Sequence, residues 1–128
     1  MIKFTVQGRP KALKRHRDAK HGKYDPSAVA KGDFAIKCSH KRPREPFAFP
    51  LHIYLQFHFE ETAKCGDANV GDTDNLTKFV LDALNGIFWK DDRYIDRITA
   101  VRYYKGNPRT EVVIMEVDDG KETRTELP

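Results

Sequence analysis

Residues 74–85 read DNLTKFVLDALN, and their apolar side chains recur at the spacing of one helix face. Five apolar residues have the i, i+3, i+4, i+7, i+8 spacing of a buried helix face: Leu76, Phe79, Val80, Ala83 and Leu84. Gly86 comes next, and glycine often ends a helix in the left-handed conformation. The segment therefore predicts a helix with one buried face, and we also expect Phe88 and Trp89 in the core.

The clearest strand pattern precedes this helix. Residues 51–59 read LHIYLQFHF, in which apolar and polar side chains alternate. Alternation of this kind predicts a strand with one face in the core. His52 and His58 belong to the other face, and we expect them to be ordinary surface or groove residues.

Weaker patterns complete the expected fold. Three more segments predict strands, the last two joined as a hairpin: residues 2–6, 95–104 and 111–117. Asp25 followed by Pro26 predicts the start of another helix, which runs to about Cys38. Together these elements predict one compact α+β domain over residues 1–128, with a small mixed sheet of about four strands and two main helices.

The charge of the chain is divided unevenly. The net charge of the 128 residues is only +4, yet residues 1–44 hold 13 Lys and Arg against three acids. The remaining residues hold 10 Lys and Arg against 16 acids. This asymmetry suggests a polyanionic partner for the basic part. Residues 10–24 carry much of that charge without hydrophobic periodicity, so we expect a mobile loop or arm there.

Other features limit the class of protein. No apolar run approaches the roughly 18 residues of a membrane span, and residues 1–8 lack the apolar block of a signal peptide. We therefore expect a soluble cytosolic domain in which Cys38 and Cys65 are reduced. Residues 118–128 are polar, and we expect this tail to fray.

Short carboxylates crowd into the middle of the chain. Seven of them fall within 30 residues: Asp67, Asp72, Asp74, Asp82, Asp91, Asp92 and Asp96. Asp72 and Asp74 stand one residue apart at the entry to the predicted helix, so their carboxylates point to the same side. Helix capping and cation binding are both open here. An EF-hand is excluded, because its fifth and sixth positions would be Leu76 and Thr77.

Lys78 lies one turn beyond Asp74, on the helix face opposite the apolar stripe, and Asp82 lies one turn further. This spacing fits either a solvated series of ion pairs or a lysine placed beside a bound phosphate.

Asp91 and Asp92 follow a short turn at residues 86–90. We expect this turn to bring them back towards Asp72 and Asp74. Three or four converging carboxylates would suit Mg²⁺, which prefers hard oxygen ligands. Mg²⁺ beside a basic arm indicates phosphodiester hydrolysis.

The central block of the chain resembles a known family. Its motifs are DTDNLTK at residues 72–78, LDALNG at residues 81–86 and FWKDD at residues 88–92. These motifs resemble the signature of the RusA-type Holliday junction resolvases. The resemblance covers about residues 70–104 and is specific, because it joins D-x-D-N-x-x-K, D-A-L and D-D at the family's spacing.

The resemblance implies an activity and a RusA-like fold. A protein of this family would be a homodimeric endonuclease that depends on Mg²⁺, with Mn²⁺ as a substitute. It would bind branched DNA, above all four-way junctions, and place paired symmetric nicks in two opposed strands. A two-fold dimer suits a substrate that has two-fold symmetry.

The resemblance also implies residue roles. Three residues match the catalytic, metal-binding carboxylates: Asp72, Asp74 and Asp92. Lys78 matches the catalytic lysine near the scissile phosphate. Asp91 is a further metal ligand, and which of the adjacent pair dominates stays open. Asn75 either orients a carboxylate or contacts DNA.

The basic residues of the first part are expected to bind the DNA backbone. Six of them form this set: Lys11, Lys14, Arg15, Arg17, Arg42 and Arg44. Phosphate contacts carry little sequence information, so the shape of the DNA would decide recognition.

Two alternatives remain. A related Mg²⁺ nuclease could act on flaps or other branched DNA, because the carboxylates specify hydrolysis and not the shape of the substrate. A non-catalytic DNA-binding module would use the aspartates only for capping and ion pairs. Such a module would be expected to lose at least one of the four catalytic residues, and all four are present, which favours an enzyme.

Overall fold

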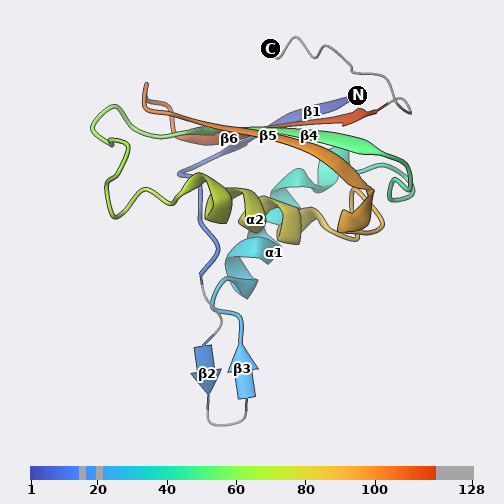
Figure 1. Cartoon of the computed structure of the whole chain (residues 1–128), viewed down its shortest axis with the longest axis horizontal. Helices are drawn as coiled ribbons and strands as arrows, with labels where there is room; N and C mark the ends of the chain where they lie inside the picture. The colour runs from blue at the N-terminus through green and yellow to red at the C-terminus, as the bar shows by residue number, and fades with distance from the viewer. Residues whose placement is uncertain (15–16, 20–21, 118–128) are drawn as a thin grey trace.

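The fold is a four-stranded mixed sheet with two helices on one of its faces (Figure 1). A computed structural model describes residues 1–14, 17–19 and 22–117, and only the backbone within 17–24. The strands lie in the order β1-β6-β4-β5. Their bounds are β1 Ile2–Gln7, β4 Leu51–His58, β5 Ile95–Tyr103 and β6 Arg109–Glu116. The predicted fold class is confirmed.

The pairing of the last two strands differs from the prediction. β6 pairs antiparallel with both β1 and β4, whereas β5 pairs with β4 in parallel, so β5 and β6 are not neighbours. The expected hairpin is therefore wrong. A parallel pair needs a long crossover connection, and here the connection contains helix α2, Thr73–Leu84. The consequence is a β4–α2–β5 unit in which β5 starts near the end of α2.

The predicted helix face packs against this sheet. The apolar side of α2 is buried, including Leu76 and Leu84 at 0% exposure and Phe79 at 2%. Phe88 and Trp89 are also fully buried, as expected. From β4, Leu51, Ile53, Leu55 and Phe57 join the same core.

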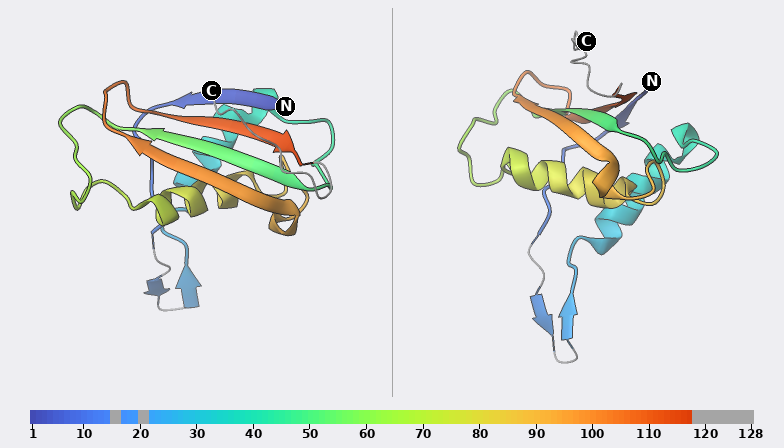
Figure 2. Two further views of the ribbon diagram at one scale, coloured as in Figure 1. Left: turned by 45° about the horizontal axis from the view of Figure 1, so that its top comes forward. Right: turned by 45° about the vertical axis from the view of Figure 1, so that its right-hand side comes forward.

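Helix α1, Ala28–Cys38, lies beside α2. The Phe34 ring meets Phe79 edge-on at 5.7 Å between centroids, and Lys31 Nζ lies 3.6 Å from Asp82 Oδ2. The helix starts later than predicted, because Ser27 is its N-cap. Asp25 accepts a hydrogen bond from the Ser27 backbone N–H and pairs with Lys31. Figure 2 shows both helices below the same face of the sheet.

The basic arm contains regular structure that the sequence pattern did not indicate. Strands β2, Arg17–Ala19, and β3, Gly22–Tyr24, pair as an antiparallel hairpin. Figure 1 shows this hairpin standing away from the sheet, on the side of the helices. The expected loop or arm therefore includes a short hairpin.

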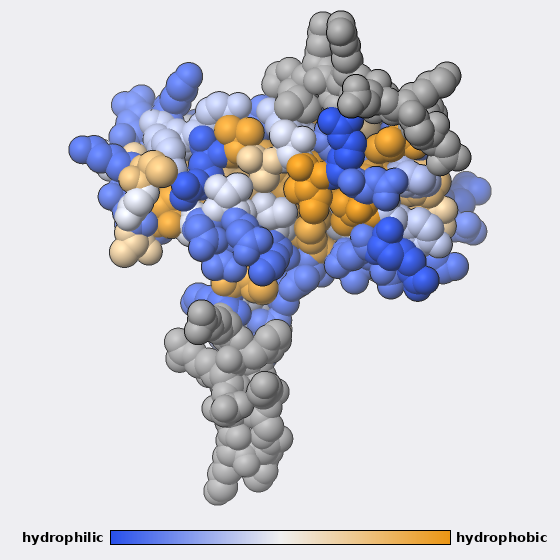
Figure 3. Space-filling model, viewed as in Figure 1, coloured by the Kyte–Doolittle hydropathy of each residue, from blue (hydrophilic) through white to orange (hydrophobic). Residues whose placement is uncertain are grey.

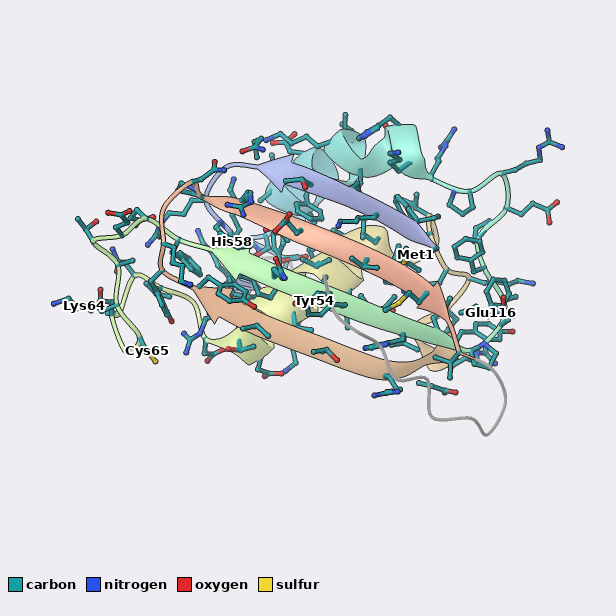
Figure 4. The ribbon with its side chains drawn as sticks, turned by 90° about the horizontal axis from the view of Figure 1, so that it is seen from above. Met1, Tyr54, His58, Lys64, Cys65 and Glu116 are labelled. Atoms are coloured by element: carbon teal, nitrogen blue, oxygen red, sulfur yellow. The ribbon has the colours of Figure 1, made fainter. Side chains whose placement is uncertain are left out.

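The other face of the sheet carries a polar network (Figure 4). His52 and His58 are buried, at 2% and 9% exposure, so their prediction as surface residues is wrong. The ring of His52 hydrogen-bonds Thr99 Oγ1 at 2.9 Å, and His58 Nε2 lies 2.9 Å from Glu111 Oε2. Side chains of neighbouring strands enclose them, which alternation along a single strand does not predict.

Burial is the main cause of lowered pKa values at both histidines. The charge of Arg97 lowers the pKa of His52 further. Arg109 does the same to the pKa of His58, against a smaller opposing effect of Glu111. Both rings are therefore held in the neutral form more strongly than free histidine.

Further expectations concern the rest of the chain. Cys38 and Cys65 are both free, and burial raises the pKa of the Cys38 thiol to about 12. Within the described ranges, no helix has the length and apolar character to cross a membrane. The predicted tail at residues 118–128 lies outside the described residues.

Candidate active site

The N-terminal end of α2 is built on Asp72. Its Oδ1 accepts a 2.8 Å hydrogen bond from the backbone N–H of Asn75, and its Oδ2 lies 3.4 Å from the side-chain Nδ2 of the same residue. This cap satisfies one of the free N–H groups at the helix start. The capping interpretation is confirmed, and Asp72 remains exposed to solvent. Asn75 thus orients the carboxylate of Asp72.

Asp74 and Lys78 lie next to this cap. Asp74 Oδ2 is 3.1 Å from Lys78 Nζ, and the two side chains are 73% and 55% exposed. A solvated pair of this type contributes only about 0.5 kcal/mol or less. Asp82 does not extend the series, because it approaches Lys31 instead. The pair can therefore separate at little cost when either side chain meets a ligand.

Contacts from distant segments hold the start of α2. The Gly71 carbonyl accepts a 3.1 Å hydrogen bond from Arg102 Nη1 on β5. The backbone N–H of Leu13 donates to the Asn75 carbonyl at 3.0 Å. Arg102 and Leu13 were not singled out from the sequence. A pattern within a short segment does not identify residues whose partners lie this far away in the chain. The one hint in the sequence that the backbone is closely packed here is the glycine at position 71, directly before Asp72.

The C-terminal end of α2 holds the other two carboxylates. Asp91 Oδ1 accepts a 2.9 Å hydrogen bond from the Arg93 backbone and caps a short helix, η2, Asp92–Tyr94. Asp92 Oδ1 accepts a 2.7 Å hydrogen bond from Trp89 Nε1. Because the Trp89 ring is fully buried, Asp92 is fixed to the core while its residue stays exposed.

The two carboxylate pairs do not converge within one chain. Twelve helical residues separate them, which corresponds to roughly 18 Å. We expected the turn after α2 to return towards Asp72 and Asp74. This prediction is wrong, because the turn leads directly into β5. Within residues 1–14, 17–19 and 22–117, no three carboxylate, histidine or cysteine side chains are grouped to hold a metal ion. Figure 3 shows hydrophilic and hydrophobic patches interspersed across the face seen in Figure 1.

A basic cleft lies near each end of the helix. An open cleft of about 460 Å³ beside Gly71 is lined by Lys11 and Lys14. A second cleft of about 490 Å³ beside Gly86 is lined by Arg42 and Arg44. Four of the six predicted DNA-binding residues thus line clefts next to the two ends of α2.

The remaining two predicted DNA contacts cannot be placed in either cleft. Arg15 lies outside the described residues, and Arg17 is described only by its backbone in β2. Arg9 also lines the first cleft, but it is engaged: its Nε lies 3.1 Å from Glu60 Oε1, and its Nη1 donates to the Asn69 carbonyl at 2.7 Å. Arg9 therefore holds the cleft wall in place.

Comparisons with known proteins identify the family of the chain. The family model described as endodeoxyribonuclease RusA matches residues 6–115. An uncharacterized protein of Bacillus subtilis (strain 168), YqaN, is 31% identical over 137 residues, which cover 91% of this chain and 96% of that protein. The match to the family model includes both ends of α2, the residues lining both basic clefts, β4, β5, nearly all of β6 and the last two residues of β1. The chain belongs to the RusA endodeoxyribonuclease family.

Proposed function

We propose that the protein is a divalent-metal-dependent endonuclease that resolves four-way DNA junctions by paired symmetric nicks during recombination and repair. The observation that carries this proposal is the exposed group Asp72, Asp74 and Lys78, beside a basic cleft in a chain of the RusA family. Asp92 completes the set of catalytic residues.

The carboxylates suit Mg²⁺ or Mn²⁺ chemically, because both cations prefer hard oxygen ligands. A single chain offers Asp72 and Asp74 at one place and Asp91 and Asp92 at another, too far apart to share an ion. We therefore propose that two copies form each site, with Asp72 and Asp74 from one copy and Asp91 and Asp92 from the other. A bound divalent cation would supply an activated water and neutralise phosphate charge.

Lys78 has its own role in this proposal. Its ammonium group lies on the same exposed turn as the two carboxylates. If Asp74 held a cation, the Lys78 ammonium would be free to face the scissile phosphate. There it stabilises the negative charge that develops during displacement.

The second copy needs a surface, and α1 offers one. Val29 and Ile36 lie two turns apart on its outer side, at 79% and 71% exposure. Asp33 and Lys37 are exposed on the same helix, so two α1 helices that pair through this side would combine apolar contacts with opposite charges.

The oligomer is tested by sedimentation at micromolar concentration. The wild-type protein should sediment as a dimer, and Ile36→Asp should shift it towards the 14.8 kDa monomer. Asp96→Asn, at an exposed position on β5, is the control. A wild-type monomer in the presence of junction DNA would contradict the two-copy site.

The function is tested with three labelled DNA substrates: a four-way junction, a flap and a linear duplex, each with and without Mg²⁺. The junction should be cut preferentially, and only with the metal. Equal cutting of all three would retain a nuclease but reject a resolvase. Binding without cutting would favour a DNA-binding module, in which the aspartates serve only the cap, the ion pair and the bond to Trp89.

A mixing experiment tests the shared site. Asp74→Asn and Asp92→Asn are each expected to be inactive alone, because both sites of either homodimer lack one carboxylate. When the two variants are mixed and allowed to exchange subunits, half of the sites in a mixed dimer are intact, and single nicks should appear. The double variant mixed with wild-type supplies the control for exchange. No recovery, despite proven exchange, would place all ligands in one chain.

A further inference from the structure

Position 71 requires glycine because a Cβ atom would not fit there, and not because of its backbone conformation. Its φ lies outside the left-handed region, unlike that of Gly86 at +82°. A Cβ atom at position 71 would lie 2.6 Å from the Cβ of Ala12 and 3.2 Å from the side chain of Leu76. Carbon atoms do not approach to 2.6 Å without displacement of one segment. Ala12 therefore packs directly on the backbone that precedes Asp72.

Residues 11–14, here called the arm root, are tied on two sides. Leu13 donates its backbone N–H to the Asn75 carbonyl, in the first turn of α2. Lys14 donates its backbone N–H to Ser27 Oγ at 2.9 Å, at the start of α1. The arm root thus bridges the starts of both helices, and its middle residues contact the segment that carries the carboxylates.

The outer residues of the arm root face the cleft. Lys11 and Lys14 are both exposed and line the 460 Å³ cleft beside Gly71. Among the described residues, neither ammonium group makes an ion pair or a side-chain hydrogen bond. Arg102 donates a hydrogen bond to the Gly71 carbonyl. Ala12 and Arg102 therefore both contact Gly71, so a displacement of the arm root would act on the backbone that leads into Asp72.

We infer that the arm root positions the carboxylates: the packing of Ala12 on Gly71 couples DNA bound at Lys11 and Lys14 to the placement of Asp72 and Asp74. This inference rests on the proposed function and assigns Ala12, Gly71 and Arg102 as positioning residues. A misplacement of about 1 Å at a reacting group can cost about 100-fold in rate. The contact is therefore tight enough to control cleavage.

The test is a double-mutant cycle on the contact itself. Gly71→Ala should reduce the maximal rate of junction cleavage by about 10- to 100-fold, with junction affinity within about twofold. Ala12→Gly removes the opposing Cβ and with it the packing contact, so it should also lower the rate, but by less than Gly71→Ala because it creates no clash. The combined variant should recover to within about threefold of Ala12→Gly, because the 2.6 Å clash is then gone and only the 3.2 Å contact with the Leu76 side chain remains. Ala68→Val, at an exposed position three residues upstream, is the control for added volume.

Mn²⁺ binding to the DNA-free protein, followed by electron paramagnetic resonance, gives a second readout. Gly71→Ala should weaken binding and the combined variant should restore it, while circular dichroism confirms that every variant is folded. If the folded Gly71→Ala variant cuts and binds Mn²⁺ as the wild-type does, the inference is wrong and the proposed function stands. If no variant, including the wild-type, cuts DNA but Mn²⁺ binding follows the cycle, the positioning role stands and the nuclease does not.

Discussion

The two ends of α2 carry the same type of side chain but hold it differently. At the N-terminal end, Asp72 and Asp74 are exposed and depend on backbone contacts made by the arm root. At the C-terminal end, Asp92 is bonded to the buried ring of Trp89 and depends on the hydrophobic core. The positions of Asp72 and Asp74 therefore depend on contacts at the surface, whereas the position of Asp92 is fixed once the hydrophobic core has formed.

The largest expected effect is loss of cleavage at the N-terminal end. Asp74→Asn should lower the rate on a four-way junction by about 100- to 1,000-fold. The free energy of unfolding should change by no more than about 1 kcal/mol, because the Asp74–Lys78 pair is exposed. Initial cleavage rates and urea unfolding measure the two effects. Wild-type cutting by this variant would remove the N-terminal end from the site.

Lys78→Met tests the N-terminal end of α2 by removing a positive charge. The rate should fall by about 100-fold, while stability changes by about 0.5 kcal/mol or less. Lys78→Arg should retain part of the activity, because it keeps the charge. Lys64→Met, on an exposed loop residue labelled in Figure 4, serves as the control for lost positive charge. Equal losses in both Met variants would indicate general electrostatic attraction in place of a specific role.

The C-terminal end should respond to changes in the core. Trp89→Phe removes the hydrogen bond to Asp92 and should destabilise the protein by about 1–3 kcal/mol, measured by urea unfolding. Phe88→Leu removes buried volume nearby without that hydrogen bond. Cleavage should fall further in Trp89→Phe than in Phe88→Leu when both are compared under folded conditions. An identical response of the two variants would show that Trp89 does not fix Asp92.

The smallest expected effect is a pH dependence of stability that comes from His58, on the face of the sheet away from the helices. It serves as a reference for the effects at both ends of α2. The pKa of His58 is lowered by burial, so the unfolded chain binds its proton more readily than the folded one. Stability from this source is present above about pH 6.5 and is lost as the pH falls through the lower, folded pKa. His58→Gln should reduce the loss of stability between pH 7.5 and pH 5.5. A slope unchanged by His58→Gln would contradict the assignment.

Much of the fold could be predicted from local patterns. The buried face of α2 and the strand β4 follow from patterns in short segments, and both elements were confirmed, although β4 is buried on both faces and not on one. The hairpin between the last two strands was wrong, because alternation along a strand does not reveal its neighbour. The connection between β4 and β5 is long enough for a parallel crossover, and β6 is shared between β1 and β4.

The candidate site shows the same limit. The residue types and their spacing identified Asp72, Asp74 and Lys78 at one end of the helix, and the structure places these three together. The position of Asp91 and Asp92 depends on the parallel crossover, which starts β5 where α2 ends. The contact between Ala12 and Gly71 joins segments about sixty residues apart and leaves no local pattern.

The pairing of β1 with β6 has a consequence for the order of folding. Ile2 pairs with Ile114 and Gln7 with Arg109, so the first strand finds its only sheet neighbour at the far end of the described chain. Contacts of such long sequence separation form late and slow the folding of a domain. During synthesis the ribosome must release β6 before the sheet can close. A growing chain would therefore carry every aspartate of the proposed site while its scaffold is incomplete, and the proposed nuclease would gain its activity only after translation of the sheet is finished.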